Sequence, residues 1–296
     1  MNMAAISRNR GPLRRLVQAV RRRWRRHRAD VHIISYPKCG RTWLVVLLSK
    51  ALELHYGIRL RKPLRLRGYA RPWRNIPYIL QHHDGGPEFL LPEELEQDKS
   101  HYAGKKVVFM VRDPRDVLVS SYFQKTRRNA NYEGQMEDYV RERRGSIETL
   151  VEFYNIWARN RDVPQDFLLL TYEDLHADTA GQLRRVLEFL GITGVSDDTI
   201  REAVEYGRFD NMRQLEATNA MGTSALSARD AADTESYKTR KGEVGGYREY
   251  LDGEDLRTVE QTIMERLDPW FDGYRYHSDP VPPEPAPSTT RDPAAP

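Results

Sequence analysis

Three residues near the start of the chain, Lys38, Gly40 and Thr42, have the types and spacing of a phosphate-binding loop. They follow a short β-prone run, Val31–Ile34, and directly precede a helical stretch. A loop between a strand and a helix N-terminus often holds a phosphate, because free backbone N–H groups and the helix dipole converge there. The loop therefore predicts an anion site.

The loop differs from a Walker A nucleotide loop. In the pattern G-x-x-x-x-G-K-[ST], the lysine directly precedes the serine or threonine. Here Lys38 comes before Gly40, and Thr42 opens the helix. This difference counts against an ATPase or an ATP-dependent kinase.

A second polar cluster follows the most continuous strand signal in the chain, Lys106–Val111. Arg112 comes directly after this strand, and Ser120 lies further on in a predicted helix. Arginine offers a planar fork of donors to a phosphate dianion, and ligands of α/β proteins bind where strands give way to helices. Arg112 and Ser120 are therefore candidates for a second phosphate site.

A third cationic segment is formed by Arg240, Lys241 and Gly242. It lies within residues 214–249, which are rich in Ala, Gly, Ser, Thr and charged residues. A stretch of this length without a hydrophobic pattern predicts a functional or mobile loop. Taken alone, three such residues are also typical of solvated surface.

In their order along the chain, these segments resemble the motifs of the sulfotransferases that use 3′-phosphoadenosine 5′-phosphosulfate (PAPS). Residues 36–43 read Y-P-K-C-G-R-T-W and are similar to the 5′-phosphosulfate loop Y-P-K-S-G-T-T-W. Residues 112–120 are similar to the 3′-phosphate motif R-[DN]-P-x-D-x-x-x-S, and residues 240–247 to the segment R-K-G-x-x-G-D-W. The resemblance extends from about Val31 to Tyr250.

The chain departs from these motifs at four positions. Cys39 and Arg41 stand where Ser and Thr are usual, and Gly246 and Tyr247 stand where Asp and Trp are usual. If backbone groups form the cradle of the loop, the changes at Cys39 and Arg41 leave binding intact and alter only side-chain contacts.

The resemblance assigns residues to each part of PAPS. Two further segments, residues 171–175 and 208–212, are similar to T-Y-E-D-[LM] and S-F-x-x-M and would supply an aromatic clamp for the adenine. The implied PAPS-binding residues are Lys38, Cys39, Gly40, Arg41, Thr42, Trp43, Arg112, Ser120, Tyr172, Phe209, Arg240, Lys241 and Gly242. No metal is expected.

The resemblance also places a catalytic histidine after the second strand, shortly before an L-P segment. Residues 81–84 read Q-H-H-D and precede Leu91-Pro92. We prefer His83 as the general base because His83-Asp84 mirrors the family's H-D pair, with His82 as the alternative. An imidazole can accept a hydroxyl proton at neutral pH, and neighbouring strand residues point to opposite faces, so one of the two is expected to face the site.

The hydrophobic pattern predicts alternating strands and helices. Strands are expected at 31–34, 78–80, 106–111 and 167–171, and helices at 42–56, 116–126, 147–160, 180–190, 197–206 and 254–267. Strands separated by helices indicate a parallel sheet, and unbroken apolar runs indicate strands covered on both faces. We therefore expect an α/β protein, which the resemblance makes a three-layer P-loop-like fold with a central parallel β-sheet flanked by helices.

We expect the chain of 296 residues to divide into an amphipathic basic arm at 1–29, a sulfotransferase domain at 30–278 and a disordered Pro-rich tail at 279–296. Cys39 is the single cysteine, so no intrachain disulfide can form. The chain also has no apolar run of membrane-spanning length and no apolar signal core. These features predict a cytoplasmic protein.

The arm concentrates positive charge. Its arginines are Arg8, Arg10, Arg14, Arg15, Arg21, Arg22, Arg23, Arg25, Arg26 and Arg28, and they exceed the formal net charge of +4 of the whole chain. Apolar residues recur among them at helical spacing, at Leu13, Leu16, Val17, Val20 and Trp24. This apolar stripe either packs on the domain or contacts a partner or an anionic membrane surface, and nucleic acid is the least favoured ligand.

The motifs together predict in-line transfer of a sulfuryl group to a hydroxyl of a small molecule or a glycan. His83 would take the hydroxyl proton, while Lys38 and the loop amides stabilise the leaving group. Two alternatives are a P-loop small-molecule kinase and a non-catalytic nucleotide-binding module recruited to membranes by the arm. The sequence identifies neither the acceptor nor the oligomeric state.

Overall fold

The computed structural model describes residues 12–223, 226–230 and 233–275. Its strands are β1 (Val31–Ser35), β2 (Ile79–His82), β3 (Lys106–Val111) and β4 (Asp166–Thr171). Its helices are α1 (Pro12–Arg28), α2 (Arg41–Tyr56), α3 (Pro114–Phe123), α4 (Met136–Arg141), α5 (Ile147–Arg159), α6 (Tyr172–Ala177), α7 (Thr179–Phe189), α8 (Asp197–Tyr206), α9 (Phe209–Ala217), α10 (Gly253–Arg266) and α11 (Asp272–Arg275).

The four strands form one parallel sheet in the order β2-β1-β3-β4. Because the strands are parallel, their carboxyl ends meet at one edge of the sheet. The loops after β1, β2, β3 and β4 carry the segments 36–40, 83–86, 112–113 and the start of α6. The topology therefore gathers the residues that the sequence singled out at this edge.

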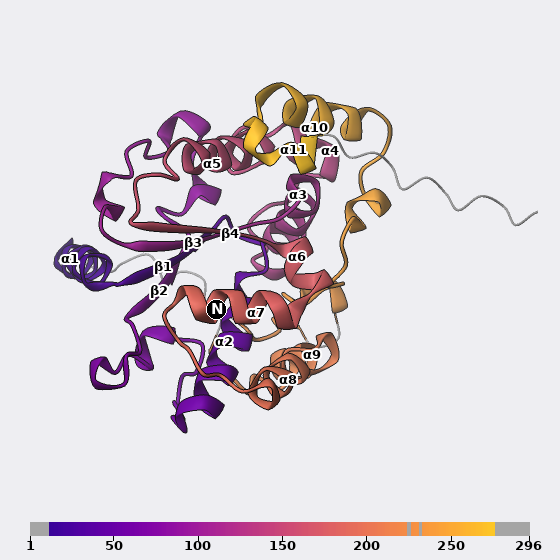
Figure 1. The fold of residues 1–296 in the computed structure, drawn as a ribbon. Coiled ribbons are helices and arrows are strands. Elements are labelled where there is room, and N and C mark those ends of the chain that lie inside the picture. Colours follow the sequence, from indigo (N-terminus) through magenta and orange to yellow (C-terminus); the bar gives the residue numbers. More distant parts are fainter. Residues whose placement is uncertain (1–11, 224–225, 231–232, 276–296) are drawn as a thin grey trace, which may run out of the picture.

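Helices cover both faces of the sheet (Figure 1), and each face has its own core. Ile33, Val108 and Met110 pack into one core with α2, α7 and α8, while Ile34 and Phe109 pack into the other with α5 and α10. Successive strand residues alternate between the two cores, which explains the unbroken apolar runs. The predicted α/β architecture of three layers is confirmed.

The structure differs from the predicted elements in several places. Helices α4, α6, α9 and α11 lie where no helix was predicted. The helix expected at 116–126 begins at Pro114, and after Phe123 it continues as a π-helical turn, Gln124–Arg128. Residues 214–217, expected to begin a long loop, instead complete α9. The Pro-rich tail at 279–296 lies outside the described residues.

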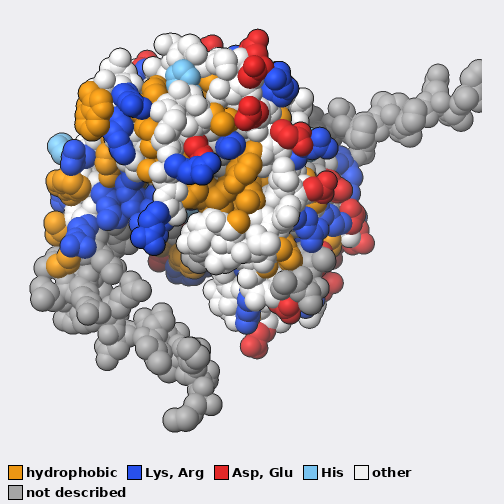
Figure 2. Space-filling model, turned by 90° about the horizontal axis from the view of Figure 1, so that it is seen from below, with side chains coloured by type: hydrophobic (Ala, Val, Ile, Leu, Met, Phe, Trp, Pro, Cys, Tyr) orange, Lys and Arg blue, Asp and Glu red, His pale blue; other side chains and the backbone are white. Residues whose placement is uncertain are grey.

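Residues 12–28 of the arm form helix α1, as expected, at the amino ends of the strands (Figure 1), where Lys105, directly before β3, donates to the His27 carbonyl at 2.9 Å. The apolar side chains described in its stripe are exposed: Val17 by 42%, Val20 by 59% and Trp24 by 53%. Figure 2 shows Lys and Arg side chains interspersed with hydrophobic ones over this side of the molecule. The stripe therefore does not pack on the domain along these residues.

None of the helices in the described part of the chain is both long enough and apolar enough to cross a membrane.

Candidate functional site

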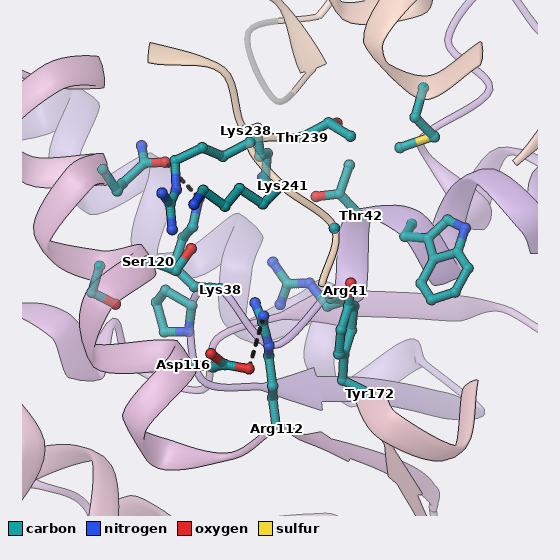
Figure 3. Close-up of a pocket in the computed structure, with 18 of the residues that line it drawn as sticks. Lys38, Arg41, Thr42, Arg112, Asp116, Ser120, Tyr172, Lys238, Thr239 and Lys241 are labelled. Carbon is teal, nitrogen blue, oxygen red and sulfur yellow. Dashed lines mark hydrogen bonds and ion pairs between the residues drawn. The ribbon is translucent and has the colours of Figure 1, made fainter. Parts of the chain in front are cut away.

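A cavity of about 440 Å³ opens at the carboxyl edge of the sheet. It is lined by parts of all three cationic segments and by the residues proposed as an aromatic clamp (Figure 3). The lining includes every sequence-predicted site residue except Cys39 and His82. The fold therefore brings together residues from positions as distant as Lys38 and Gly242.

The loop after β1 turns sharply into α2. Gly40 has φ 86°, a left-handed conformation that favours glycine, and a Cβ there would lie 2.6 Å from Cδ2 of Tyr172. Lys38 also has a positive φ of 76°, and its Nζ donates to Gln124 Oε1 at 3.2 Å. The loop thus presents a lysine and the N-terminus of α2 to the cavity.

The Cys39 side chain points away from the cavity into the core. Its Sγ lies 3.2 Å from the Tyr154 hydroxyl, and the residue has no exposed surface. Burial, only partly offset by the hydrogen bond to Tyr154, raises the pKa of the thiol to about 12. Cys39 can therefore contribute to anion binding through its backbone but not through a thiolate.

Arg112 lies over the Tyr172 ring, with its guanidinium carbon 4.3 Å from the ring centroid. Its Nη2 donates to Asp116 Oδ2 at 3.2 Å and to the Glu243 carbonyl at 2.7 Å. Its buried Nε has no hydrogen-bond partner among the described residues. An unsatisfied buried guanidinium N–H is costly, so this group is suited to receive an anionic oxygen.

Asp116 joins the segment after β3 to the segment that carries Arg240 to Gly242. Its carboxylate accepts the backbone N–H groups of Gly245 and Tyr247, each at 2.9 Å. Gly246 and Tyr247, where the family motif has Asp and Trp, lie in the 3-10 turn that this contact holds.

Arg240 and Lys241 reach the cavity but are already paired with acids of their own segment. Arg240 Nη1 donates to Glu235 at 3.1 Å and to the Tyr250 hydroxyl at 2.7 Å. Lys241 Nζ contacts Glu249. These two cations must therefore exchange partners, at least in part, to bind a phosphate.

Three aromatic side chains, Trp43, Tyr172 and Phe209, line the cavity from α2, α6 and α9. The Trp43 and Tyr172 ring centroids are 5.7 Å apart, and Trp43 Nε1 is fixed by a 2.8 Å hydrogen bond to the Gly207 carbonyl. Rings held in this way offer stacking faces to a planar base.

His83 lies in the cavity wall, one residue beyond the end of β2. Its Nδ1 is 2.8 Å from the Ser35 carbonyl, which can only accept, so Nδ1 carries the proton and Nε2 holds the lone pair. That Nε2 is 2.7 Å from Arg41 Nη2, which donates to it. Burial, followed by the Arg41 charge, lowers the pKa of His83 well below its ordinary value of 6.5.

His82 points to the opposite side, into a buried polar network outside the cavity lining. Its Nε2 lies 3.0 Å from His32 Nδ1, and its Nδ1 accepts the backbone N–H of Asp84 at 3.1 Å. The Asp84 carboxylate is paired with Lys99 at 2.8 Å and accepts from the Tyr102 hydroxyl. Asp84 thus belongs with His82 rather than with His83.

The sequence reasoning missed several polar residues of the cavity. The π-helical turn brings Gln124 and Lys125 into the lining, and Lys238 and Thr239 enter it from the segment before Arg240. No hydrophobic period or motif marks these positions. A lysine two residues before the R-K-G segment was the available signal.

A buried carboxylate holds this segment in place. Glu216, with no exposed surface, accepts the backbone N–H groups of Lys238 at 2.6 Å and Thr239 at 2.9 Å, and pairs with Arg128 at 2.6 Å. Burial, followed by the charges of Arg41 and Arg128, lowers the pKa of Lys238 to about 8.

Lys38, Arg41, Arg112 and Lys238 thus converge on one cavity (Figure 3). Burial, followed by the charges of Lys238 and Arg128, lowers the pKa of Lys38 well below its ordinary value. Arg41 Nη1, like Arg112 Nε, is buried without a partner among the described residues. Such crowding of cations around unsatisfied donors is suited to a ligand that carries several negative charges.

Sequence and structure comparisons agree with this chemistry. A sulfotransferase domain family matches residues 28–271. Mouse sulfotransferase 2A1 is 24% identical over 264 residues, which cover 86% of this chain and 90% of that protein. Cytosolic sulfotransferase 12 of Arabidopsis thaliana is 24% identical over 268 residues, covering 81% of this chain and 77% of its own length.

Two solved structures share the fold. Mouse sulfotransferase SULT7A1 complexed with PAP superposes with a TM-score of 0.57 at 21% identity, covering 81% of this chain and 84% of that chain. Retinol dehydratase in a complex with retinol and PAP gives a TM-score of 0.56 at 19% identity, covering 81% and 82%. Because the family match spans most of the domain, from before β1 to beyond α10, this chain belongs to the sulfotransferase family.

Proposed function

We propose that the protein transfers the sulfuryl group of PAPS to a hydroxyl group of an acceptor. The observation that carries the proposal is the convergence on one cavity of the α2 loop, with Lys38, and the partly unsatisfied guanidinium of Arg112. These two groups can bind two separate anionic ends of one ligand, and the aromatic rings can stack against its nucleobase. Relatives solved with PAP support this reading.

Each implied residue has a role in holding PAPS, which supplies an activated sulfuryl group on a phosphate leaving group. Lys38 and the backbone of Cys39 to Thr42 would hold the 5′ end, and Arg112 with Ser120 the 3′-phosphate. Arg240, Lys241 and the backbone of Gly242 would close over the 3′ side. Trp43, Tyr172 and Phe209 would stack against or enclose the adenine.

His83 is the proposed general base. The acceptor oxygen forms a bond to sulfur as the bond from sulfur to the phosphate oxygen breaks, and the hydroxyl proton passes to His83 Nε2. In the structure Arg41 donates to that nitrogen, so Arg41 must turn away or share it when the acceptor enters. Lys38 stabilises the charge that develops on the leaving phosphate.

The charges for this transfer are supplied by arginine and lysine, and we propose that it proceeds without a metal ion. We also place the protein in the cytoplasm, since its relatives include cytosolic sulfotransferases. The exposed apolar residues of α1 and their arginine neighbours support peripheral contact with an anionic membrane surface.

The experiment follows labelled sulfate from PAPS onto a panel of phenols, sugars, lipids and peptides, with ATP and magnesium as a parallel donor. The proposal expects transfer from PAPS to a hydroxyl-bearing acceptor and no phosphorylation from ATP. Phosphoryl transfer would favour the kinase alternative. Tight PAPS binding without turnover on any acceptor would favour a non-catalytic module.

A further inference from the structure

One wall of the cavity is not accounted for by PAPS. Glu88 lies five residues after His83 and interacts electrostatically with Arg41, the residue that holds His83. Phe89, Lys125 and the mouth residues Asn129 and Asn131 line the cavity as well. None of these belongs to a nucleotide motif, and the wall they form adjoins the proposed base.

This wall is a built feature and not a chance gap. Gly145 has φ 63°, and a Cβ on it would lie 2.0 Å from the Glu88 carbonyl oxygen, so only glycine allows the two segments to approach. The Gly145 N–H donates to the Leu90 carbonyl at 2.9 Å, and Arg144 Nη1 donates to the Phe89 carbonyl at 2.8 Å. Lys125 Nζ donates to the Gly145 carbonyl at 3.3 Å. Packing against Gly145 and hydrogen bonds from residues 144–145 therefore fix the backbone at Glu88 and Phe89.

The Glu88 side chain has an unmet hydrogen-bonding requirement. Its Oε2 is buried and has no partner among the described residues. Burial raises the pKa of this carboxyl. A hydrogen bond from the backbone of Glu88 itself, followed by the Arg41 and Lys125 charges, opposes that shift. A buried carboxylate oxygen without a donor is costly, so a ligand that brings an O–H or N–H group to it gains affinity.

The charges and side-chain types of the other wall residues limit the chemical class of the ligand. Arg41, Lys125 and Lys238 surround this part of the cavity with positive charge, which disfavours an ammonium group as the donor. Phe89 is 60% exposed and contributes an aromatic ring to the cavity, whose lining also includes the amides of Asn129 and Asn131. An aromatic platform combined with carboxylate and amide groups suits a ring that is apolar on one face and hydroxylated at its edge.

We propose that the acceptor is a saccharide, with one hydroxyl donating to Glu88 and the ring stacked on Phe89, so that a neighbouring hydroxyl faces His83. The inference rests on the proposed function and deepens it. A sterol has a single hydroxyl, which would face His83, so its apolar rings would bury Glu88 Oε2 without a donor. We therefore expect the site to favour sugars over sterols.

The test compares matched acceptors. Rates of sulfate transfer from PAPS are measured for 4-nitrophenyl monosaccharide glycosides, for 4-nitrophenol and for a sterol. The expected result is a kcat/KM for at least one glycoside about tenfold or more above that for either non-sugar acceptor. Further arms with an oligosaccharide and with a glycolipid in vesicles distinguish a free glycan from a lipid headgroup as the source of the sugar.

Variants of Glu88 and Phe89 test whether these residues cause the expected preference for glycosides. Glu88→Ala and the nearly isosteric Glu88→Gln should each raise KM for the glycoside about tenfold, and Phe89→Ala should act in the same direction. Glu133→Gln, at an exposed acid outside the cavity lining, is the matched control and should change nothing. Unchanged KM in both folded Glu88 variants overturns the inference, as does a preference for 4-nitrophenol or the sterol.

Binding of adenosine 3′,5′-bisphosphate, measured on the same samples, distinguishes failure of the proposed function from failure of the saccharide inference. If this nucleotide does not bind, the proposed function itself is wrong. If it binds and no panel member is sulfated, ligand-observed NMR on the nucleotide-loaded protein decides. Glycoside binding that Glu88→Ala weakens supports the inference, and absence of glycoside binding overturns it.

Discussion

At the scale of single residues, the contact between Arg41 and His83 is the feature that most distinguishes this site from the family motif. Arg41 stands where Thr is usual, and its guanidinium occupies the lone pair of the proposed base. A positive charge at this distance disfavours protonation of the imidazole. His83 is therefore held neutral and oriented. In the proposed mechanism it accepts a proton once the arginine is displaced.

This arrangement predicts how His83 titrates. In the nucleotide-free protein its pKa should lie below 6.5, so the ring stays neutral until the pH falls well under that value. Arg41→Thr removes the cationic part of the effect but not the burial, and should raise the pKa toward 6.5. NMR titration of the imidazole Cε1–H measures both values. An equal or lower pKa in the variant would show that Arg41 does not control the base.

The choice between the two histidines yields a second prediction. His83→Ala should reduce turnover by roughly 10²–10⁴-fold, the usual contribution of a general base, with nucleotide affinity nearly unchanged. His82→Ala should affect turnover much less and instead lower the free energy of unfolding by roughly 1–3 kcal/mol, since His32 and Asp84 lose a buried partner. Steady-state kinetics and denaturant unfolding measure the two effects. A larger kinetic loss in His82→Ala would reverse the assignment.

At the scale of elements, the segment with Arg240 to Gly242 depends on a carboxylate outside it. Glu216, at the end of α9, accepts two backbone N–H groups of this segment and pairs with Arg128 of the π-helical turn. One buried side chain thus joins two elements that reach the cavity.

Glu216→Gln tests this role of the carboxylate. The variant keeps the size of the side chain but removes its charge, so affinity for adenosine 3′,5′-bisphosphate should fall by about tenfold, the size of one charge-assisted hydrogen bond. Amide hydrogen exchange should rise at 238–242 and stay unchanged in β1 and β3. Equal exchange at 238–242 in both proteins would contradict the positioning role.

The elements also show what the sequence could predict. The runs Val31–Ile34 and Lys106–Val111 were located correctly because strands buried on both faces are continuously apolar. The π-helical turn could not be predicted, since it adds one residue to a helical turn without changing composition. It is this turn that presents Lys125 to the cavity wall near Glu88 and Arg128 to Glu216.

The same contrast holds within the site. Most residues of the family motifs line the cavity, with Cys39 as an exception, and the His83 and His82 side chains lie in different surroundings. Glu88, Glu216 and Lys238 were missed because their roles arise from contacts between segments distant in sequence. Nothing in the residue types near them marks those contacts.

At the scale of the whole molecule, charge is divided between the arm and the domain. The ten arginines of residues 1–28 exceed the net charge of the chain, so the domain by itself is net negative. The arm supplies no residue to the cavity lining among the residues described. We therefore expect the arm to determine membrane binding and the domain to determine sulfate transfer.

Deletion of residues 1–28 tests this separation. The truncated protein should keep its turnover with a soluble acceptor but lose binding to vesicles that contain anionic lipid, because roughly 1 kcal/mol of attraction is lost for each arginine near the surface. Vesicle sedimentation with neutral lipid serves as the control. Loss of turnover in a folded truncated protein would place part of the active domain within the arm.

The most direct test of the proposed function is a calorimetric titration with adenosine 3′,5′-bisphosphate, compared with 5′-AMP and with ATP plus magnesium. We predict that the bisphosphate binds at least tenfold more tightly than either, because in the proposed site Arg112 and Ser120 hold its 3′-phosphate. Lys38→Ala and Arg112→Ala should each weaken it by roughly 1.5–3 kcal/mol, about 10–150-fold, while Arg201→Ala on exposed α8 should not. Equal affinity for 5′-AMP, or unchanged affinity in both site variants, would contradict the account.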